Sequence, residues 1–148
     1  MQIKSFLKKV SPNIVKDVRL HLVPYIYHFD KYVLYPINIH YINPSIARMA
    51  GDVNIFCQFL EKSEAEIEIM IAEQDCRRKG LGMIAVKLMM EFARKELGKT
   101  RFISKISQKN VPSIKLFEKL GYKLWKNVEV FNEVHYEYNC LDGKELFP

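Results

Sequence analysis

The chain has 148 residues, 49% of them apolar and 27% charged, with a formal net charge of +6. That length and composition are those of an ordinary soluble globular protein, so we expect one domain over residues 1–148. No apolar run approaches about 20 residues, which argues against a membrane-spanning helix. The positive charge suits anionic partners, but the basic residues are scattered from Lys4 to Lys144 and mostly predict a solvated exterior.

Cysteine and histidine spacing predicts no metal site and no disulfide framework. The three cysteines, Cys57, Cys76 and Cys140, are far apart and form no C-x-x-C pair. The four histidines show no ligand spacing with them. The amino-terminal residues lack the apolar segment of a signal peptide. We therefore expect reduced thiols and a cytoplasmic location.

The first elements in chain order are a predicted strand and a predicted short helix. Residues 18–25 alternate in strand fashion and stop at Pro24. Residues 28–37 predict a short helix that must end before Pro36, because the residue before a proline is disfavoured in helical geometry.

The next two segments predict further strands. Residues 47–60 predict a hairpin that turns near Gly51–Asp52. Its second strand places three side chains on one face: Val53, Ile55 and Cys57. Residues 64–73 alternate clearly between apolar and polar. One face of this strand carries Ile67, Ile69 and Ile71, and the other carries Glu66, Glu68 and Met70.

The second half of the chain predicts two amphipathic helices. From Leu81 onward, apolar residues recur at helical spacing until Gly98, a common helix terminator. The second helix has Asn110 at its cap and Gly121 at its end. Strands are predicted before and after it, at residues 101–106 and 122–139. The order of elements predicts an α/β or α+β fold, a sheet with helices packed on it.

The stretch "CRRKGLGMIA", residues 76–85, can be compared with three phosphate-binding motifs. The Walker loop requires a lysine after its last glycine, but Met83 follows Gly82. The dinucleotide fingerprint G-x-G-x-x-G/A matches residues 80–85. However, the acidic ribose ligand that this fingerprint requires about 20 residues later is missing from the sequence.

The third motif, [RQ]-x-x-G-x-[GA] between a strand and a helix, fits residues 77–82 completely. A helix N-terminus offers free N–H groups and partial positive charge, and glycines let a pyrophosphate approach that backbone. Arg77, Arg78 and Lys79 add charge for a ligand with more phosphate than one pyrophosphate. The alternative interpretation is a helix opened by a glycine turn.

This hexapeptide resembles the acetyl-CoA signature of the GNAT superfamily of N-acetyltransferases. Five segments are similar, in order, to the N-acetyltransferase-nine-like family: "VRLHLVPY", "GDVNIF", "EIEIMIAEQDCRRKGLG", "KNVPSIKLFEKLGY" and "VFNEV". The resemblance covers roughly residues 18–138. It implies a mixed, mostly antiparallel central sheet flanked by helices. It also implies transfer of an acetyl group to a primary amine by direct attack, with a protein or peptide as the acceptor.

The resemblance further implies where the co-substrate acetyl-CoA would bind. Its pyrophosphate would lie on Arg77, Arg78, Lys79, Gly80, Leu81 and Gly82. Its pantetheine would pair, like an added strand, with the backbone of Met70, Ile71 and Ala72. Asn110 would hydrogen-bond the cofactor or a bridging water, assisted by Ser113, although a plain helix N-cap is an equal alternative for Asn110.

The acceptor amine must be neutral before it attacks the thioester. A lysine with a pKa near 10.4 is only about 0.04% neutral at pH 7, whereas an α-amine with a pKa near 8 is about 10% neutral. A lysine acceptor therefore depends more on a general base. The candidates are Glu66 and Glu68 on the polar face of their strand, and Glu66 is the closer match to the usual glutamate of the superfamily. The alternative is that both glutamates merely face solvent.

The chain departs from the family pattern at two places. The segment between Pro24 and Gly51 is much shorter than in the family, where two helices usually help to wall the acceptor site. Phe117 stands where many members carry a tyrosine that protonates the departing CoA thiolate. Because the pKa of the CoA thiol is close to that of cysteine, about 8.5, the thiolate can depart with little help.

Two rival functions follow from these observations. One is an acyl-CoA-binding or protein-interaction module with weak turnover or none, which the two departures favour. The other is a small basic nucleic-acid-binding domain, for which the sequence offers charge but no recognisable motif. We therefore expect protein acetylation first and nucleic-acid binding last.

Overall fold

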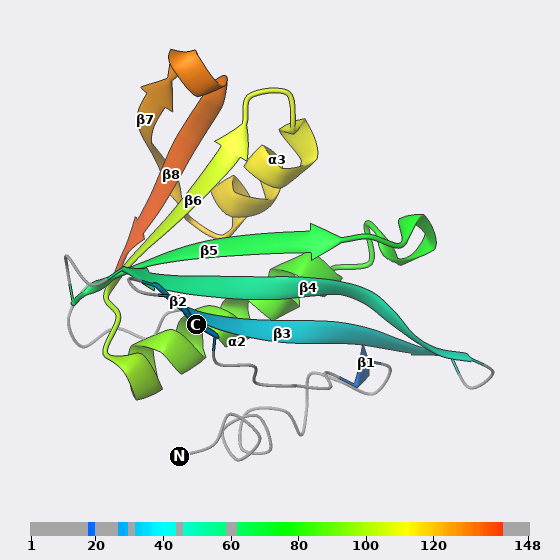
Figure 1. The fold of residues 1–148 in the computed structure, drawn as a ribbon. Coiled ribbons are helices and arrows are strands. Elements are labelled where there is room, and N and C mark those ends of the chain that lie inside the picture. Colours follow the sequence, from blue (N-terminus) through cyan, green and yellow to red (C-terminus); the bar gives the residue numbers. More distant parts are fainter. Residues whose placement is uncertain (1–17, 20–26, 30–31, 44–45, 59–61, 141–148) are drawn as a thin grey trace.

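A computed structural model describes residues 18–19, 27–29, 32–43, 46–58 and 62–140 (Figure 1). In this part of the chain the strands form one eight-stranded sheet in the order β1-β3-β4-β5-β6-β8-β7, and β2 pairs with β3. The strands are β1 (Val18–Arg19), β2 (Tyr27–Phe29), β3 (Tyr32–Asn43), β4 (Ile46–Gln58), β5 (Glu64–Ile71), β6 (Arg101–Ser107), β7 (Lys123–Val128) and β8 (Glu133–Asn139). The helices are α2 (Leu81–Leu97), α3 (Val111–Lys119) and the short 3₁₀ turns η1 (Gln74–Cys76) and η2 (Glu129–Phe131).

The sheet is mixed but mostly antiparallel, which confirms the expected fold class. Among the described strands, β5 and β6 form the single parallel pair, and all other pairs are antiparallel. No helix within the described residues is long and apolar enough to cross a bilayer.

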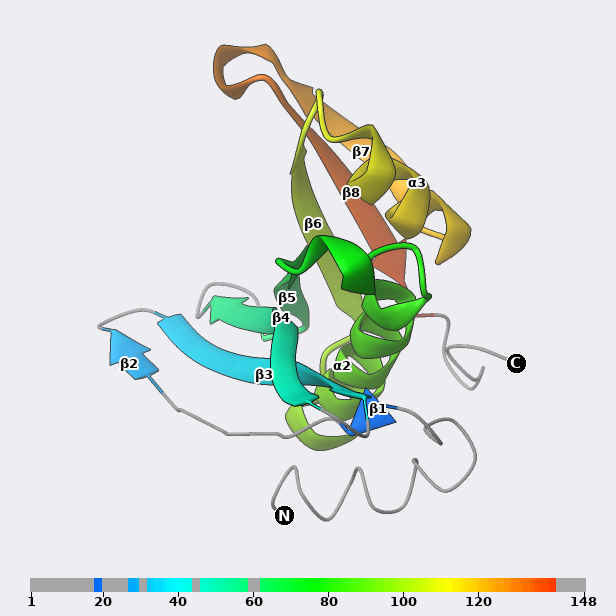
Figure 2. The same cartoon turned by 90° about the vertical axis from the view of Figure 1, so that its right-hand side faces the viewer.

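The helices α2 and α3 lie on the same face of the sheet (Figure 2). The core fills the space between them and the strands, and its largest fully buried side chains are Val53, Ile55, Ile67, Val86, Met89, Met90, Phe102 and Phe117. The hydroxyl of Tyr136 on β8 donates to Glu118 of α3 at 2.9 Å. On β5 the side chains of Glu64, Glu66 and Glu68 alternate with the buried side chains of Ala65 and Ile67, so they point to the opposite face of the sheet.

The two amphipathic helices predicted in the second half of the chain are confirmed. The chain enters a left-handed backbone conformation at Gly98, with φ of 65°, and α2 ends there. Asn110 caps α3, and its side-chain oxygen accepts a hydrogen bond from the backbone N–H of Ser113 at 3.3 Å. The predicted strands in residues 64–73, 101–106 and 122–139 are also present, as β5, β6, β7 and β8. Of the strand predicted at residues 18–25, Val18–Arg19 is strand, and the rest lies outside the described residues.

The helix predicted at residues 28–37 is wrong. Residues 28–29 lie in β2 and residues 32–37 lie in β3, with Pro36 opposite Asn54 of β4, while residues 30–31 lie outside the described residues. The segment "YVLYPI" is apolar at nearly every position, so periodicity alone cannot distinguish a strand from a short buried helix. Its aromatic and β-branched residues favour a strand, and pairing with β4 over the whole length of β3 decides the outcome.

The hairpin turn predicted near Gly51–Asp52 is also wrong, because β4 runs through it without a break. The register with β3 shifts between Ile39 and His40, which pair with Gly51 and Met49. Ala50 is therefore the extra residue of a β-bulge. A Cβ atom on Gly51 would lie 1.9 Å from the carbonyl oxygen of Met70. The glycine marks a close approach of two strands rather than a turn.

Strands β5 and β6 diverge after a short parallel contact, and we call the resulting V-shaped opening the fork (Figure 1). They pair over three positions, from Glu64 opposite Arg101 to Glu66 opposite Ile103. At this closed end, Arg101 bonds to Glu64 and to Glu137 of β8, and its guanidinium lies 4.5 Å from the centroid of the Trp125 ring. The open end points toward the start of α2 and the start of α3.

Candidate functional site

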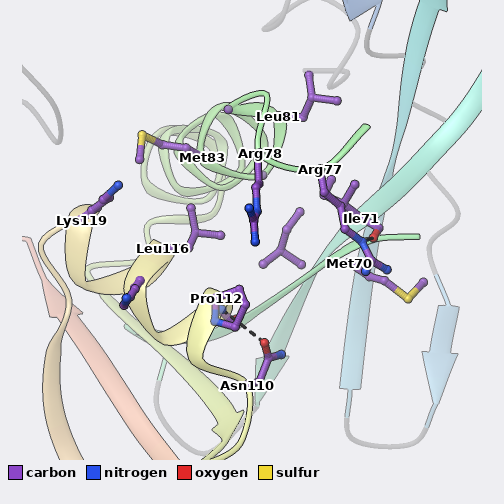
Figure 3. A pocket seen from close by; sticks show the side chains of 15 residues that line it. Met70, Ile71, Arg77, Arg78, Leu81, Met83, Asn110, Pro112, Leu116 and Lys119 are labelled. Carbon is purple, nitrogen blue, oxygen red and sulfur yellow. Dashed lines mark hydrogen bonds between the residues drawn. The ribbon is translucent and has the colours of Figure 1, made fainter. Parts of the chain in front are cut away.

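A pocket of about 740 Å³ occupies the open end of the fork (Figure 3). Its walls come from the last residues of β5, the loop before α2, the first turn of α2 and the exposed side of α3. The lining residues are Ile69, Met70, Ile71, Arg77, Arg78, Gly80, Leu81, Gly82, Met83, Asn110, Pro112, Ser113, Lys115, Leu116 and Lys119.

The pocket brings together the predicted cofactor-binding residues from three separate stretches of sequence. All of them line it except Ala72 and Lys79. Ala72 follows β5 directly, and its N–H donates to the carbonyl of Ala50 at 2.9 Å. Lys79 is exposed in the loop before α2. The motif and the second-helix signature therefore meet at one site, although about 30 residues separate them in the sequence.

Arg77 stabilises the end of β5. Its Nε donates to the carbonyl oxygen of Ile71 at 2.9 Å, and its Nη2 donates to that of Ala72 at 3.2 Å. The guanidinium thus ties the loop to the strand and places its positive charge at the mouth of the pocket. A strand end held in this way keeps the backbone of Ile71 in a fixed position for a ligand.

The loop between η1 and α2 lines the pocket with Arg77, Arg78 and Gly80. Arg78 and Gly80 both have positive φ angles, of 60° and 80°. Gly80 is the N-cap of α2, and in the described part of the chain no side chain caps the helix there. The first turn contains no acidic residue. Its partial positive charge is therefore uncompensated by local side chains and favours an anion.

The backbone of β5 faces two different neighbours in alternation. Residues of a strand direct their N–H and C=O groups to opposite edges in turn. The backbone N–H of Ala72 donates to Ala50 of β4, so the backbone groups of Met70, two residues earlier, also point toward β4. The backbone N–H and C=O groups of Ile69 and Ile71 therefore point into the fork. The carbonyl of Ile71 already accepts from Arg77. Among the backbone N–H groups of β5 that point into the fork, that of Ile71 is therefore nearest to the loop before α2, and it can donate to a ligand.

The two predicted bases, Glu66 and Glu68, lie on the polar face of β5 but in different surroundings. Glu66 accepts a hydrogen bond from Lys105 of β6, with 2.7 Å between Oε2 and Nζ. In the described part of the chain no such bond engages Glu68. Burial, followed by repulsion from Glu66 and from Asp52, raises the pKa of Glu68 above its usual value, and Lys105 opposes this increase. A carboxylate with a raised pKa is the better proton acceptor.

Phe117 lies in the core rather than in the pocket. Its side chain is 1% exposed and packs edge-on against Tyr122, with the ring centroids 4.9 Å apart. The hydroxyl of Tyr122 is also buried and donates to the sulfur of Met90 at 3.3 Å. Burial raises the pKa of Tyr122 well above its usual value. Neither aromatic residue lines the pocket, so neither offers a proton donor there.

Several lining residues were not predicted from the sequence. They are Ile69, Met83, Pro112, Lys115, Leu116 and Lys119. Lys115 and Lys119 are four residues apart on the exposed side of α3, and helical spacing predicts that such residues share a face. The four-residue spacing could therefore have been used to predict that these two lysines lie side by side. It places two further cations beside a pocket that already holds Arg77 and Arg78.

Comparison with protein families gives a match over most of the sequence. The family model described as "Acetyltransferase (GNAT) domain" matches residues 31–123. This range contains β3, β4, β5, α2, β6 and α3, so it includes every wall of the pocket.

Curated proteins give more specific similarities. The chain is 48% identical over 87 residues to the human "Alpha/beta-tubulin-N-acetyltransferase 9", a match covering 58% of this chain and 42% of that protein. It is 44% identical over 105 residues to an "N-acetyltransferase 9-like protein" of Nematostella vectensis, covering 70% of this chain and 53% of that one. The matches thus span about half the length of these relatives.

A solved structure of similar fold is a domain from Methanocaldococcus jannaschii. It aligns with a TM-score of 0.63 at 32% sequence identity, covering 72% of this chain and 66% of that one. The structure comparison therefore supports the fold, and the family model identifies the family.

Proposed function

The chain belongs to the acetyltransferase (GNAT) domain family, and on this basis we propose that it is an N-acetyltransferase that transfers the acetyl group of acetyl-CoA to a primary amine of a protein. The observation that carries the proposal is the pocket at the open end of the fork, where a glycine loop, a helix N-terminus and a free strand edge converge. These are the features that a pyrophosphate joined to an extended amide chain requires.

Acetyl-CoA fits this pocket in one direction. The pyrophosphate lies against the N–H groups at the start of α2, with Arg78 beside them. The pantetheine amides then extend along the free edge of β5, where the N–H of Ile71 can donate. The cations of α3, Lys115 and Lys119, add attraction for the remaining phosphate. The acetyl group comes toward the closed end, near Glu68.

The chemical step needs no covalent enzyme intermediate. Glu68 takes a proton from the acceptor ammonium, and the neutral amine attacks the thioester carbonyl carbon. A carbon–nitrogen bond forms, the carbon–sulfur bond breaks, and its electron pair leaves with the CoA sulfur. The thiolate then takes the second proton released by the nitrogen. The products are the acetylated amine and CoA, and the proton on Glu68 returns to solvent.

The acceptor is proposed to be a protein amine, either a lysine or an N-terminal amine. The human relative carries α- and β-tubulin in its name. Tubulin is therefore the first protein acceptor to test, beside peptides with a free N-terminus or an internal lysine.

The test of this function begins with calorimetric titration of the protein with acetyl-CoA, CoA and NADH. We expect both CoA species to bind and NADH not to bind, because the fork offers no acidic ribose ligand. Acetylation of tubulin and of the peptides is then followed by mass spectrometry. Absence of CoA binding would refute the proposal at its first step.

Replacing Arg78 by glutamate should weaken acetyl-CoA binding at least about tenfold, since a hydrogen bond to a charged group is worth about 1.5–3 kcal/mol. The new carboxylate would also repel the pyrophosphate. Titration calorimetry measures the effect. The matched control is Lys62→Glu, an equal charge reversal at an exposed residue just before β5, at the opposite end from the pocket. Equal affinities for the two variants would rule out this placement of the pyrophosphate.

Replacing Gly82 by leucine should abolish most acetyl-CoA binding without harming the fold. A Cβ atom on Gly82 would lie 3.4 Å from Leu116 and 3.6 Å from Ile69, so a larger side chain extends into the pocket. In a helix leucine is more favourable than glycine by about 0.8 kcal/mol. We therefore expect a melting temperature that is unchanged or higher, together with a large loss of affinity. Gly82→Ala should lie between wild type and Gly82→Leu in affinity.

A second candidate function is an acyl-CoA-binding module with little or no turnover. Phe117 favours it, because a buried phenylalanine replaces the tyrosine that protonates the thiolate in many family members. The segment between Pro24 and Gly51, which is much shorter than in the family and contains β2 and β3, favours it as well, because two helices usually help to wall the acceptor site there. Tight CoA binding without acetylation of any protein or peptide amine would establish this alternative.

A further inference from the structure

The two carboxylates of the proposed active site share one cation. Glu66 and Glu68 are two residues apart on the same face of β5, and the ammonium of Lys105 lies 2.7 Å from Glu66. The side chain of Glu66 is 12% exposed, and that of Lys105 is 38% exposed. A pair of this kind is partly shielded from solvent, so its charges still act on groups nearby.

Lys105 reaches Glu66 across the fork. Pairing between β5 and β6 ends at Glu66 and Ile103, and Lys105 is two residues further along β6 on the same face. Its side chain must therefore bend back toward the closed end to meet Glu66. The ion pair between Lys105 and Glu66 therefore spans the fork at the position where pairing between β5 and β6 ends.

The charged groups facing Glu68 come from several strands. On β4, Asp52 faces it, and Asn54 opposite Glu68 donates to Asp52 at 2.6 Å. On β5 the neighbour is Glu66, and on β6 it is Lys105. Beyond Lys105, β8 places His135 opposite it in register, 3.2 Å from Glu133. Lys105 is thus the cation among the described residues that acts on Glu68, against two neighbouring carboxylates.

We propose that Lys105 is a positioning residue that holds Glu66 in an ion pair, so that Glu68 accepts the proton of the acceptor amine. The inference rests on the proposed function, in which Glu68 is the general base. It explains why two glutamates on one strand face can differ in role. The positive charge of Lys105 lies beside the negative charge of Glu66, and so it opposes the effect of Glu66 on the ionisation of Glu68.

The direction of the effect follows from the charges. Lys105 favours the ionised form of Glu68, whereas Glu66 and Asp52 disfavour it. Without Lys105, the full charge of Glu66 acts on Glu68, and Glu68 becomes ionised only at higher pH. Proton transfer requires ionised Glu68. The rate therefore falls on the acidic side of the pH profile and stays unchanged on the plateau.

The experiment compares Lys105→Met with wild type in two measurements. The first is the pH profile of kcat/KM, and the second is a carbon NMR titration of the Glu68 carboxyl in the protein without cofactor. In Lys105→Met we expect kcat/KM on the acidic limb to fall about threefold or more, because the positive charge that favours the ionised form of Glu68 is lost. The NMR midpoint of Glu68 should move to higher pH.

Two matched variants separate charge from structure. Lys105→Arg keeps the positive charge, so the acidic limb of the kcat/KM profile and the NMR midpoint of Glu68 should both stay near their wild-type values. Lys95→Met removes a lysine that lies 3.8 Å from Glu91 on α2, which packs on the other face of the sheet. It should leave both measurements unchanged.

The outcomes distinguish this inference from the proposed function. An NMR midpoint of Glu68 that is the same in Lys105→Met and wild type would overturn the inference. A midpoint that moves while the pH profile stays fixed supports the control of Glu68 by Lys105 but refutes Glu68 as the base. If the NMR midpoint and the acidic limb both move in Lys105→Met, and neither moves in Lys105→Arg or Lys95→Met, the result supports the inference and the proposed function.

Discussion

Replacing Glu68 by glutamine is expected to lower kcat for acetyl transfer about 100-fold or more, because general base catalysis typically contributes a factor of about 10²–10⁴. Acetyl-CoA affinity should not change, since Glu68 does not line the pocket. The loss should be larger for a lysine acceptor than for an α-amine, which at pH 7 is about 10% neutral without help. Steady-state kinetics with matched peptides, together with calorimetry, measure both quantities.

The pH profile of the wild-type protein should also reflect the role of Glu68 as the base. Burial and then repulsion by Glu66 raise the pKa of Glu68, so its carboxyl remains protonated to a higher pH than an ordinary glutamate. Because the ionised form accepts the proton, activity is present above this pKa and is lost as the pH falls through it. Glu68→Gln should abolish this acidic limb.

Glu66→Gln is the matched control. Glu66 is already engaged by Lys105, so its loss should lower kcat on the pH plateau less than about tenfold, well short of the Glu68 effect. If Glu66→Gln were the more damaging of the two substitutions, the assignment of the base would have to be reversed.

Replacing Gly51 by alanine should destabilise the fold by about 3 kcal/mol or more, the upper end of what overpacking costs. The new Cβ would lie 1.9 Å from the carbonyl oxygen of Met70 and 2.9 Å from the Cα of Ile71. These are backbone atoms, so they can yield only if β4 and β5 separate. Urea denaturation measures the stability, and calorimetry with acetyl-CoA reports on the displaced end of β5.

Gly98→Ala provides the comparison for this prediction. Gly98 has a φ of 65° and open space around its Cα, so alanine there suffers backbone strain of about 1–2 kcal/mol but no collision. A loss of stability for Gly51→Ala no larger than that for Gly98→Ala would mean that the two strands do not approach as closely as described.

The elements with one clear periodicity were predictable from the sequence. The alternation of β5 and the helical stripe of α2 each indicate one structure, and Gly98 and Asn110 mark ends that local chemistry fixes. By contrast, β3 is apolar at nearly every position from Tyr32 to Ile37, and its state depends on pairing with β4, which is not a local property. The glycine before Asp52 likewise has a tertiary cause, contact with Met70, that resembles a turn signal in the sequence.

The site was predictable where a motif lies in one stretch of sequence and unpredictable where it depends on a contact across the sheet. The loop from Arg77 to Gly82 carries its own signature, and nearly all of it lines the pocket. The difference between Glu66 and Glu68 could not be foreseen, because it arises from Lys105, which is 39 residues from Glu66 in the sequence. Matching to the family favours Glu66, whereas the ion pair favours Glu68 as the free base.

The fork also bears on the solubility of the chain. Past Glu66, β5 presents an unpaired edge, the kind of surface on which other polypeptides add strands and aggregate. An incoming strand would have to fit side chains on both of its faces. At Gly82 even one added carbon atom would already touch Leu116 and Ile69. The close walls leave less room for the side chains of an added strand than an open edge would, so the same geometry that borders the proposed pantetheine site also hinders strand addition there.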